Sequence, residues 1–89
     1  MSSPTVFIPT QLRNYTGGAT VVQAQGSTVD ELLAALDARY PGLRFRVVDE
    51  QRRIRQHMRI FVDGERVEEV GAKVGARGEV HIFGALSGG

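Results

Sequence analysis

The C-terminal end of the chain is the part best suited to covalent chemistry, because it finishes with Leu86, Ser87, Gly88 and Gly89. Two glycines place no side chain near the terminal carboxylate, so such an end can thread a narrow channel and reach a nucleotide phosphate. A carboxylate becomes a good acyl donor once ATP converts it to an acyl-adenylate, and sulfide or a persulfide can then displace AMP to leave a thiocarboxylate. The reacting residue would be Gly89. Diglycine ends also arise by chance, so their meaning depends on the domain that precedes them.

The other side chains offer little catalytic chemistry. The chain contains no cysteine, which excludes a cysteine nucleophile, a disulfide and a thiolate metal site. Its two histidines, His57 and His81, are far apart in the sequence and have no carboxylate spaced as a co-ligand, so we expect no metal site. Any sulfur that this protein handles must therefore sit on its terminus.

Length and composition indicate one small globular domain. The chain has 89 residues, of which 42% are hydrophobic. A domain of this size buries about 60–65% of its unfolded surface, which leaves little room for a deep catalytic cleft. The net charge of +1 does not favour nucleic acid as the main partner. No apolar run is long enough to span a membrane, and the first residues lack a signal-peptide pattern, so we expect a cytoplasmic protein that is monomeric alone.

One amphipathic helix is the clearest predicted element. Thr28 can cap its N-terminus and Glu31, three residues later, can complete a capping box. Pro41-Gly42 ends the helix. Its apolar stripe has the spacing i, i+3, i+4, i+7 and i+11 and consists of Val29, Leu32, Leu33, Leu36 and Tyr40.

Strands are predicted on both sides of this helix, from runs rich in β-branched and aromatic residues. Asp63-Gly64 predicts a two-residue hairpin turn between two of them. Residues 43–48, with Phe45 among them, are predicted to form a short buried segment with a helical turn. Residues 49–56 are predicted to be an exposed charged loop. The strands are expected at residues 5–9, 20–24, 59–62, 65–67 and 80–83.

This order of elements predicts a β-grasp fold of the α+β class, in which a mixed sheet packs on one main helix. The first and last strands should lie side by side at the sheet centre. Alternation along the strands should turn the aliphatic residues toward the helix, and Phe7, Phe61 and Phe83, with His81, to the outer face. Such an apolar patch is typical of a protein–protein site. Two alternatives are that residues 43–48 fold over the patch, or that the register slips by one residue.

Several stretches, taken together, resemble the MoaD/ThiS family of sulfur carriers, and its longer CysO-like members in particular. The resemblance covers nearly the whole chain. Residues 51–52, Gln-Arg, stand where many members have a glycine turn, and Gly84 stands where proline is common. The matching stretches are residues 8–13 with 16–18, 26–33, 40–42, 60–65, 78–82 and 86–89.

This resemblance implies a ubiquitin-like domain at residues 1–83 and a flexible diglycine tail at residues 84–89. It also implies a protein cosubstrate rather than an enzyme. A MoeB/ThiF-like adenylating enzyme would use ATP and a sulfur donor to convert Gly89 to the thiocarboxylate. A sulfur-accepting synthase for cysteine, molybdopterin or another sulfur-containing metabolite would receive the sulfur. No bound cofactor is implied. The partner-binding residues would be Gly88, Ser87 and Leu86 in the channel and Phe7, Phe61 and Phe83 on the docking surface.

Two other functions remain open at the level of the sequence. The first is a ubiquitin-like modifier that is joined to lysines of other proteins through Gly89. The second is an interaction module that uses the phenylalanine patch alone, for which removal of Gly88 and Gly89 would change nothing. The basic run from Arg52 to Arg59 has two interpretations, a solvated loop or a surface that steers the chain toward an acidic partner.

Overall fold

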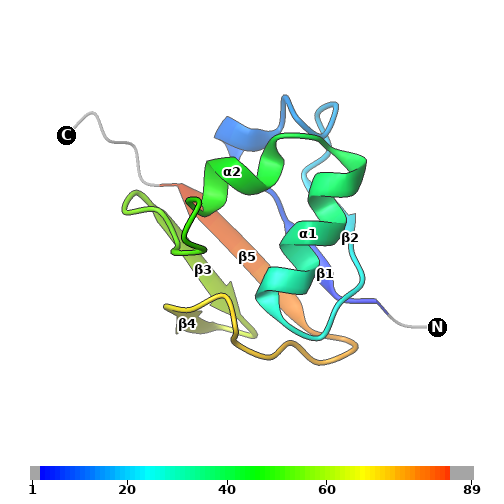
Figure 1. The fold of residues 1–89 in the computed structure, drawn as a ribbon. Coiled ribbons are helices and arrows are strands. Elements are labelled where there is room, and N and C mark those ends of the chain that lie inside the picture. Colours follow the sequence, from blue (N-terminus) through cyan, green and yellow to red (C-terminus); the bar gives the residue numbers. More distant parts are fainter. Residues whose placement is uncertain (1–2, 85–89) are drawn as a thin grey trace.

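The computed structural model describes residues 3–84 and shows a mixed five-stranded sheet with its helices on one side (Figure 1). The strand order is β2-β1-β5-β3-β4, in which β1 and β5 are parallel and the other neighbours are antiparallel. The predicted β-grasp fold, with the first and last strands adjacent at the sheet centre, is confirmed. The elements are β1 (Thr5–Phe7), η1 (Thr10–Leu12), β2 (Val21–Gln23), α1 (Val29–Arg39), α2 (Leu43–Val47), β3 (Met58–Val62), β4 (Glu65–Val67) and β5 (Glu79–Gly84).

The N-terminus of α1 is held by reciprocal hydrogen bonds, close to the predicted capping box. The Glu31 amide donates to the Thr28 hydroxyl at 3.2 Å. The Glu31 carboxylate accepts from the Ser27 amide at 2.7 Å and from the Ser27 hydroxyl at 3.0 Å, one residue before the expected partner. These hydrogen bonds, the one from the Ser27 amide above all, lower the pKa of Glu31. Both interactions satisfy amide donors that a bare helix end would leave without partners.

A tight turn sets the register between β3 and β4. Asp63 and Gly64 have φ angles of 50° and 88°, and Val62 pairs with Glu65 directly across the turn. Positive φ at both central residues defines a type I′ turn, whose twist matches that of the flanking strands. The predicted two-residue hairpin is therefore confirmed.

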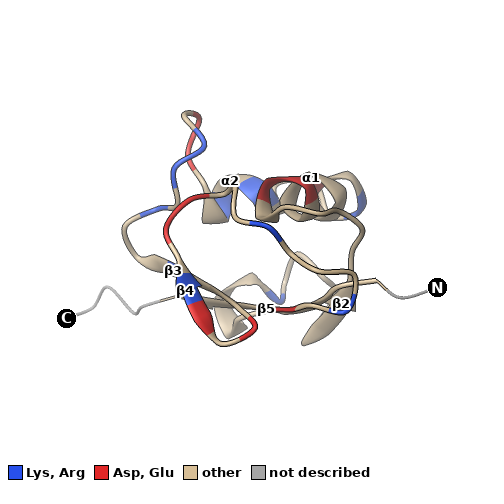
Figure 2. Cartoon of the chain, turned by 90° about the horizontal axis from the view of Figure 1, so that it is seen from below, with Lys and Arg blue, Asp and Glu red and all other residues tan. Residues whose placement is uncertain are grey.

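The hydrophobic core lies between the sheet and the two helices (Figure 2). From α1, Leu32, Leu33 and Leu36 are buried, and Leu36 has no exposed surface. The strands contribute their aliphatic face to this core, as alternation predicts. Ile8, which follows β1, also belongs to the core, and the strand residues of the core are Val6, Val22, Met58, Ile60, Val62, Val80 and Ile82.

One expectation about α2 is wrong. Leu43 and Val47 are fully buried, but Phe45 between them is 56% exposed. The helical period explains the difference, because residues i and i+4 share one face of a helix while residue i+2 points away. The helix also lies on the same side of the sheet as α1 (Figure 2), so residues 43–48 do not cover the outer phenylalanines. Within residues 3–84, no helix is long and apolar enough to cross a membrane.

Candidate functional site

Cross-strand pairing brings the predicted outer residues together on the open face of the sheet. Phe7 of β1 pairs with His81 of β5, and His81 pairs with Phe61 of β3. On the other side Phe7 pairs with Val21 of β2, so one row of side chains crosses four strands. We call Phe7, Val21, Phe61, His81 and Phe83 the aromatic patch.

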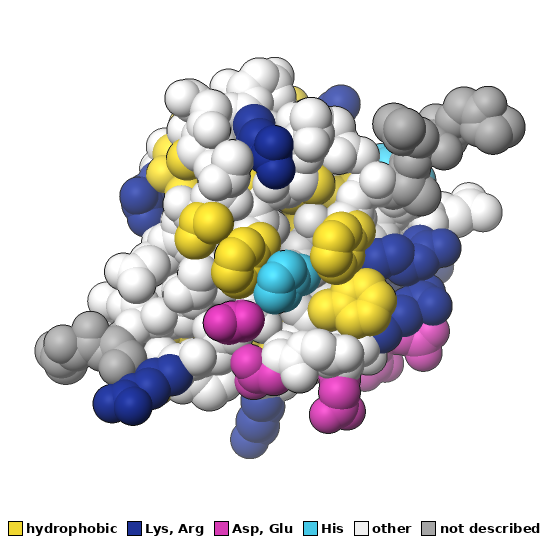
Figure 3. All heavy atoms as spheres, turned by 180° about the vertical axis from the view of Figure 1, so that it is seen from behind, with side chains coloured by type: hydrophobic (Ala, Val, Ile, Leu, Met, Phe, Trp, Pro, Cys, Tyr) yellow, Lys and Arg dark blue, Asp and Glu magenta, His cyan; other side chains and the backbone are white. Residues whose placement is uncertain are grey.

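The rings of the aromatic patch are in mutual contact. His81 stacks on Phe7 with ring centroids 4.1 Å apart and planes at 4°, and it lies 6.0 Å from Phe83 at 11°. Phe61 meets Phe83 edge to face, with centroids 5.6 Å apart. Phe83 is 51% exposed and Val21 46% exposed, whereas the other three are half-buried. The predicted placement of Phe7, Phe61, His81 and Phe83 on the outer face is confirmed. Together with Val21 they form a continuous surface that no described segment covers (Figure 3).

Val21 is the member of the patch that sequence reasoning missed. It stands in the doublet Val21-Val22, where both side chains are aliphatic and alternation alone does not show which one faces the core. The pairing of β2 with β1 resolves this ambiguity, because Val22 lies opposite the buried Val6 and Val21 lies opposite Phe7.

A shallow groove of about 420 Å³ runs beside the patch, between η1 and the end of β5. Phe83, Gly84 and Gln11 are among its lining residues. A Cβ atom at Gly84 would overlap the side-chain amide of Gln11. The glycine therefore lets η1 pack closely against the last strand residue, and a larger residue there would require the exposed Gln11 side chain to move.

The last strand leads the chain to its C-terminus from the centre of the sheet. Gly84 ends β5 and lies opposite Met58 at the start of β3. The predicted tail residues Leu86, Ser87, Gly88 and Gly89 lie outside the described residues, so their roles stay predictions. The structure shows where this tail starts. Gly84, the last described residue, directly follows Phe83 of the aromatic patch.

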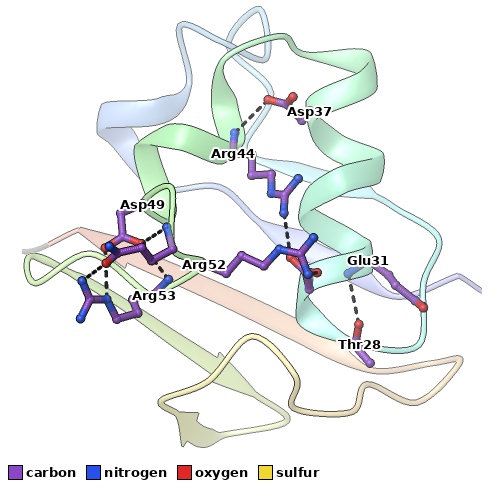
Figure 4. Close-up of polar contacts among 9 residues, drawn as sticks. Thr28, Glu31, Asp37, Arg44, Asp49, Arg52 and Arg53 are labelled. Carbon is purple, nitrogen blue, oxygen red and sulfur yellow. Dashed lines mark hydrogen bonds and ion pairs between the residues drawn. The ribbon is translucent and has the colours of Figure 1, made fainter.

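Much of the basic run is neutralised on the helix side (Figure 4). Asp30 of α1 contacts Arg44 at 3.1 Å and Arg52 at 3.5 Å. Asp49 contacts Arg53 at 3.5 Å and accepts a hydrogen bond from the Arg53 amide at 2.9 Å, which lowers the pKa of Asp49. These arginines therefore belong to local structure, as the interpretation as a solvated loop expects.

One non-glycine residue of this loop has a backbone conformation that is typical of glycine. Arg52 has a φ of 63°, in the left-handed region that non-glycine residues adopt at a cost. This is one of the two positions, 51–52, where the sequence departs from a glycine turn. The loop therefore carries local backbone strain at Arg52.

Comparison with known proteins agrees with this architecture. The model of the ThiS family matches residues 6–89. Sulfur carrier protein CysO of Mycobacterium tuberculosis is 34% identical over 90 residues, which cover 96% of this chain and 97% of that protein. The crystal structure of M. tuberculosis CysO has a TM-score of 0.88 with 31% identity, and it covers 93% of this chain and 99% of that chain.

Two further solved structures are similar over most of their length. A chain of the Amycolatopsis orientalis BexX/CysO complex has a TM-score of 0.91 and 33% identity, covering 98% of this chain and all of that chain (100%). SAMP1 from Haloferax volcanii has a TM-score of 0.81 and 26% identity, covering 98% of this chain and 99% of that chain. On the family match and the CysO identity together, this chain belongs to the ThiS family.

Proposed function

We propose that this protein is a sulfur carrier whose reactive group is the C-terminal carboxylate of Gly89. The carboxylate attacks the α-phosphorus of ATP, so that an acyl-adenylate forms and pyrophosphate leaves. Sulfide then adds to the acyl carbon and AMP leaves, which produces the thiocarboxylate. The thiocarboxylate donates its sulfur to a biosynthetic enzyme and returns as the carboxylate after hydrolysis. The protein is thus a cosubstrate of two enzymes.

The observation that carries this proposal is the position of the aromatic patch relative to the chain end. The patch is the outer face of the central strands, and β5 passes from it directly to Gly84. The five residues after Gly84 can reach at most about 18 Å. When a partner docks on the patch, the terminus would therefore be able to reach a buried active site of that partner. The similarity to CysO proteins, which are named sulfur carriers, supports the same function.

The partners that this chemistry requires are an adenylating enzyme of the MoeB/ThiF type and a sulfur-accepting synthase. Phe7, Phe61 and Phe83 offer each of them an apolar docking surface, in which exposed aromatic rings are the side chains that dominate binding energy. The A. orientalis structure holds CysO together with BexX, so a similar protein forms a complex with another protein. We propose that Leu86, Ser87 and Gly88 occupy the partner's channel.

The proposal is tested by intact-protein mass spectrometry after incubation with an adenylating enzyme, ATP and sulfide. We expect a mass gain equal to the replacement of one oxygen by sulfur. A variant without Gly88 and Gly89 should show no gain, and it is a matched control because the deletion leaves every residue of the described domain, 3–84, in place. No gain with several adenylating enzymes that are active on their own carriers would contradict the proposal, and the patch would then serve an interaction module alone.

Conjugation to proteins is the second candidate function. It is favoured by the similarity to SAMP1 of H. volcanii, a protein whose full name is small archaeal modifier protein 1. The same acyl-adenylate would then be attacked by a lysine amine instead of sulfide. Isopeptide adducts of Gly89 in cell extracts, detected by peptide mass spectrometry, would support this function, and their absence alongside the thiocarboxylate would exclude it.

A further inference from the structure

The outer face of the sheet carries both basic and acidic side chains around the aromatic patch (Figure 3). Arg59 pairs with Phe83, and Arg66 pairs with Phe61, so the strand register places both arginines on the face of the aromatic patch. Glu79 precedes His81 on the same face, and its amide donates to the Asp63 carboxylate at 2.9 Å. Arg59 thus lies near the end of β5, Arg66 lies on β4 in the row of Phe61 and His81, and the carboxylates of Asp63 and Glu79 lie near the beginning of β5.

Neither of the two arginines forms an ion pair with a carboxylate of the part of the chain that the structure describes. Among residues 3–84, Arg44, Arg52 and Arg53 contact carboxylates, whereas no carboxylate oxygen lies within 4.0 Å of Arg59 or Arg66. The Arg59 guanidinium instead donates from Nη1 to the carbonyls of Gln56 at 2.6 Å and Met58 at 2.9 Å. These bonds fix its position, and they leave its charge without a carboxylate partner among residues 3–84.

Arg59 and Arg66 also share a groove at the edge of the sheet. Arg55 and Glu68 line the same groove, so three cations face a single carboxylate there. The Arg55 guanidinium donates a hydrogen bond from Nε to the Phe45 carbonyl at 2.6 Å, so this side chain is directed toward α2. Arg59 and Arg66 are the two cations of this groove that the strand register places on the face of the aromatic patch.

The strand register relates this cationic end to the start of the tail. Gly84 lies opposite Met58, the residue that precedes Arg59, so the tail starts beside Arg59. A partner that accepts the tail must open its channel at this end of the sheet. Because opposite charges across an interface steer association and fix orientation, the residues around that opening are expected to be acidic.

We propose that Arg59 and Arg66 dock on an acidic rim at the mouth of the channel of the adenylating enzyme. This inference rests on the proposed function and specifies the chemistry of the partner surface. The carboxylates of Asp63 and Glu79 reinforce the orientation, because in a reversed complex they would face the acidic rim and repel it. The aromatic patch provides most of the binding affinity, and the arginines orient the carrier on its partner and raise the association rate.

Association kinetics between the purified carrier and its adenylating enzyme test this inference. In the double variant Arg59→Glu/Arg66→Glu, we expect the association rate at low salt to fall by about 10-fold or more, with much less change in the dissociation rate. The difference should shrink at high ionic strength, because salt screens exposed charges. Lys73→Glu is the matched control. Lys73 is exposed and lies beside Thr28 at the start of α1, away from the patch, and its reversal should leave the rate nearly unchanged.

A charge-preserving variant separates charge from folding. Arg59→Lys/Arg66→Lys should keep most of the wild-type rate, whereas a reversal variant that has lost its fold would show it in circular dichroism. Equal rates for the wild type, the reversal variant and the Lys73→Glu control would overturn the inference while leaving the sulfur-carrier function intact. Failure of the wild type to bind any adenylating enzyme, or to gain sulfur from one, would instead count against the proposed function.

Discussion

The two faces of the sheet use the same strands for opposite purposes. On the inner face Val6, Ile60 and Ile82 are at most 2% exposed and contact the helices. On the outer face their sequence neighbours are Phe7, which stacks on His81, and Phe61 and Phe83, which meet edge to face, and these rings remain open to a partner. Because strand residues alternate between faces, one register positions both the core and the docking surface. The inner face is expected to control stability, and the outer face is expected to control binding.

Truncation in the core should have the largest effect on stability. Leu36→Ala removes a fully buried side chain of α1 and should lower the free energy of unfolding by about 2–5 kcal/mol, because it leaves a cavity that the helix and sheet cannot close. Urea denaturation followed by circular dichroism measures this loss. A loss below about 1 kcal/mol would show that the inner face tolerates truncation and would remove the contrast with the outer face.

Truncation of the outer face should affect binding far more than folding. Phe83→Ser should change the free energy of unfolding by about 1 kcal/mol or less, because the side chain is 51% exposed. The same change should weaken binding to the adenylating enzyme by roughly 10-fold or more, as expected for an aromatic residue at the centre of an interface. Titration calorimetry and denaturation of one preparation report both quantities. Unchanged binding with reduced stability would assign Phe83 to the fold instead.

The N-terminal cap of α1 is expected to contribute to the stability of the helix that covers the inner face. Thr28→Ala removes the hydroxyl that accepts from the Glu31 amide and should cost about 1 kcal/mol of stability. Thr28→Ser keeps an acceptor at the same place and serves as the control. Thermal denaturation should therefore rank the wild type and the serine variant above the alanine variant. Sulfur loading should be the same in all three folded proteins.

The loop at Arg52 lies outside both faces of the sheet, and its left-handed backbone conformation is expected to lower stability. Arg52→Ala removes the ion pair with Asp30 but keeps a Cβ atom at a φ of 63°, whereas Arg52→Gly also removes the strain. The glycine variant should be the more stable of the two by about 1 kcal/mol. The ion pair itself is exposed and contributes about 1 kcal/mol or less. Equal stabilities in urea would mean that the left-handed conformation carries no penalty here.

The pH dependence of stability should reveal the cap at Glu31. Its pKa is lower in the folded protein than its ordinary value of 4.5, so its contribution is present above pH 4.5 and is lost as the pH falls through the folded-state pKa. Glu31→Gln cannot titrate, so its urea midpoint should fall less than that of the wild type between pH 6 and acid. Asp49 also has a lowered pKa, but it changes stability with pH in the same way in both proteins. The difference between the two urea midpoints therefore reports Glu31 alone.

Local rules were sufficient for most of the fold. Thr28 and Glu31 predict the helix start because caps act within one turn, and Asp63-Gly64 predicts a turn because few residues accept a positive φ. Phe45 was misjudged because a short apolar run does not reveal its period. The interaction of Asp30 with Arg44 and Arg52 joins distant segments, so no local pattern could predict it.

The sequence by itself determined the order of the strands around the main helix, the faces of β1, β3 and β5, and the diglycine end, because these depend on side-chain period and chain chemistry. Tertiary structure alone decided which side chains meet. It placed Val21 in the aromatic patch, left Arg59 and Arg66 without an ion pair to any carboxylate of residues 3–84, and set the start of the tail beside Arg59. Such contacts depend on strand pairing between residues far apart in the chain. That pairing is a property of the folded sheet and not of any single segment.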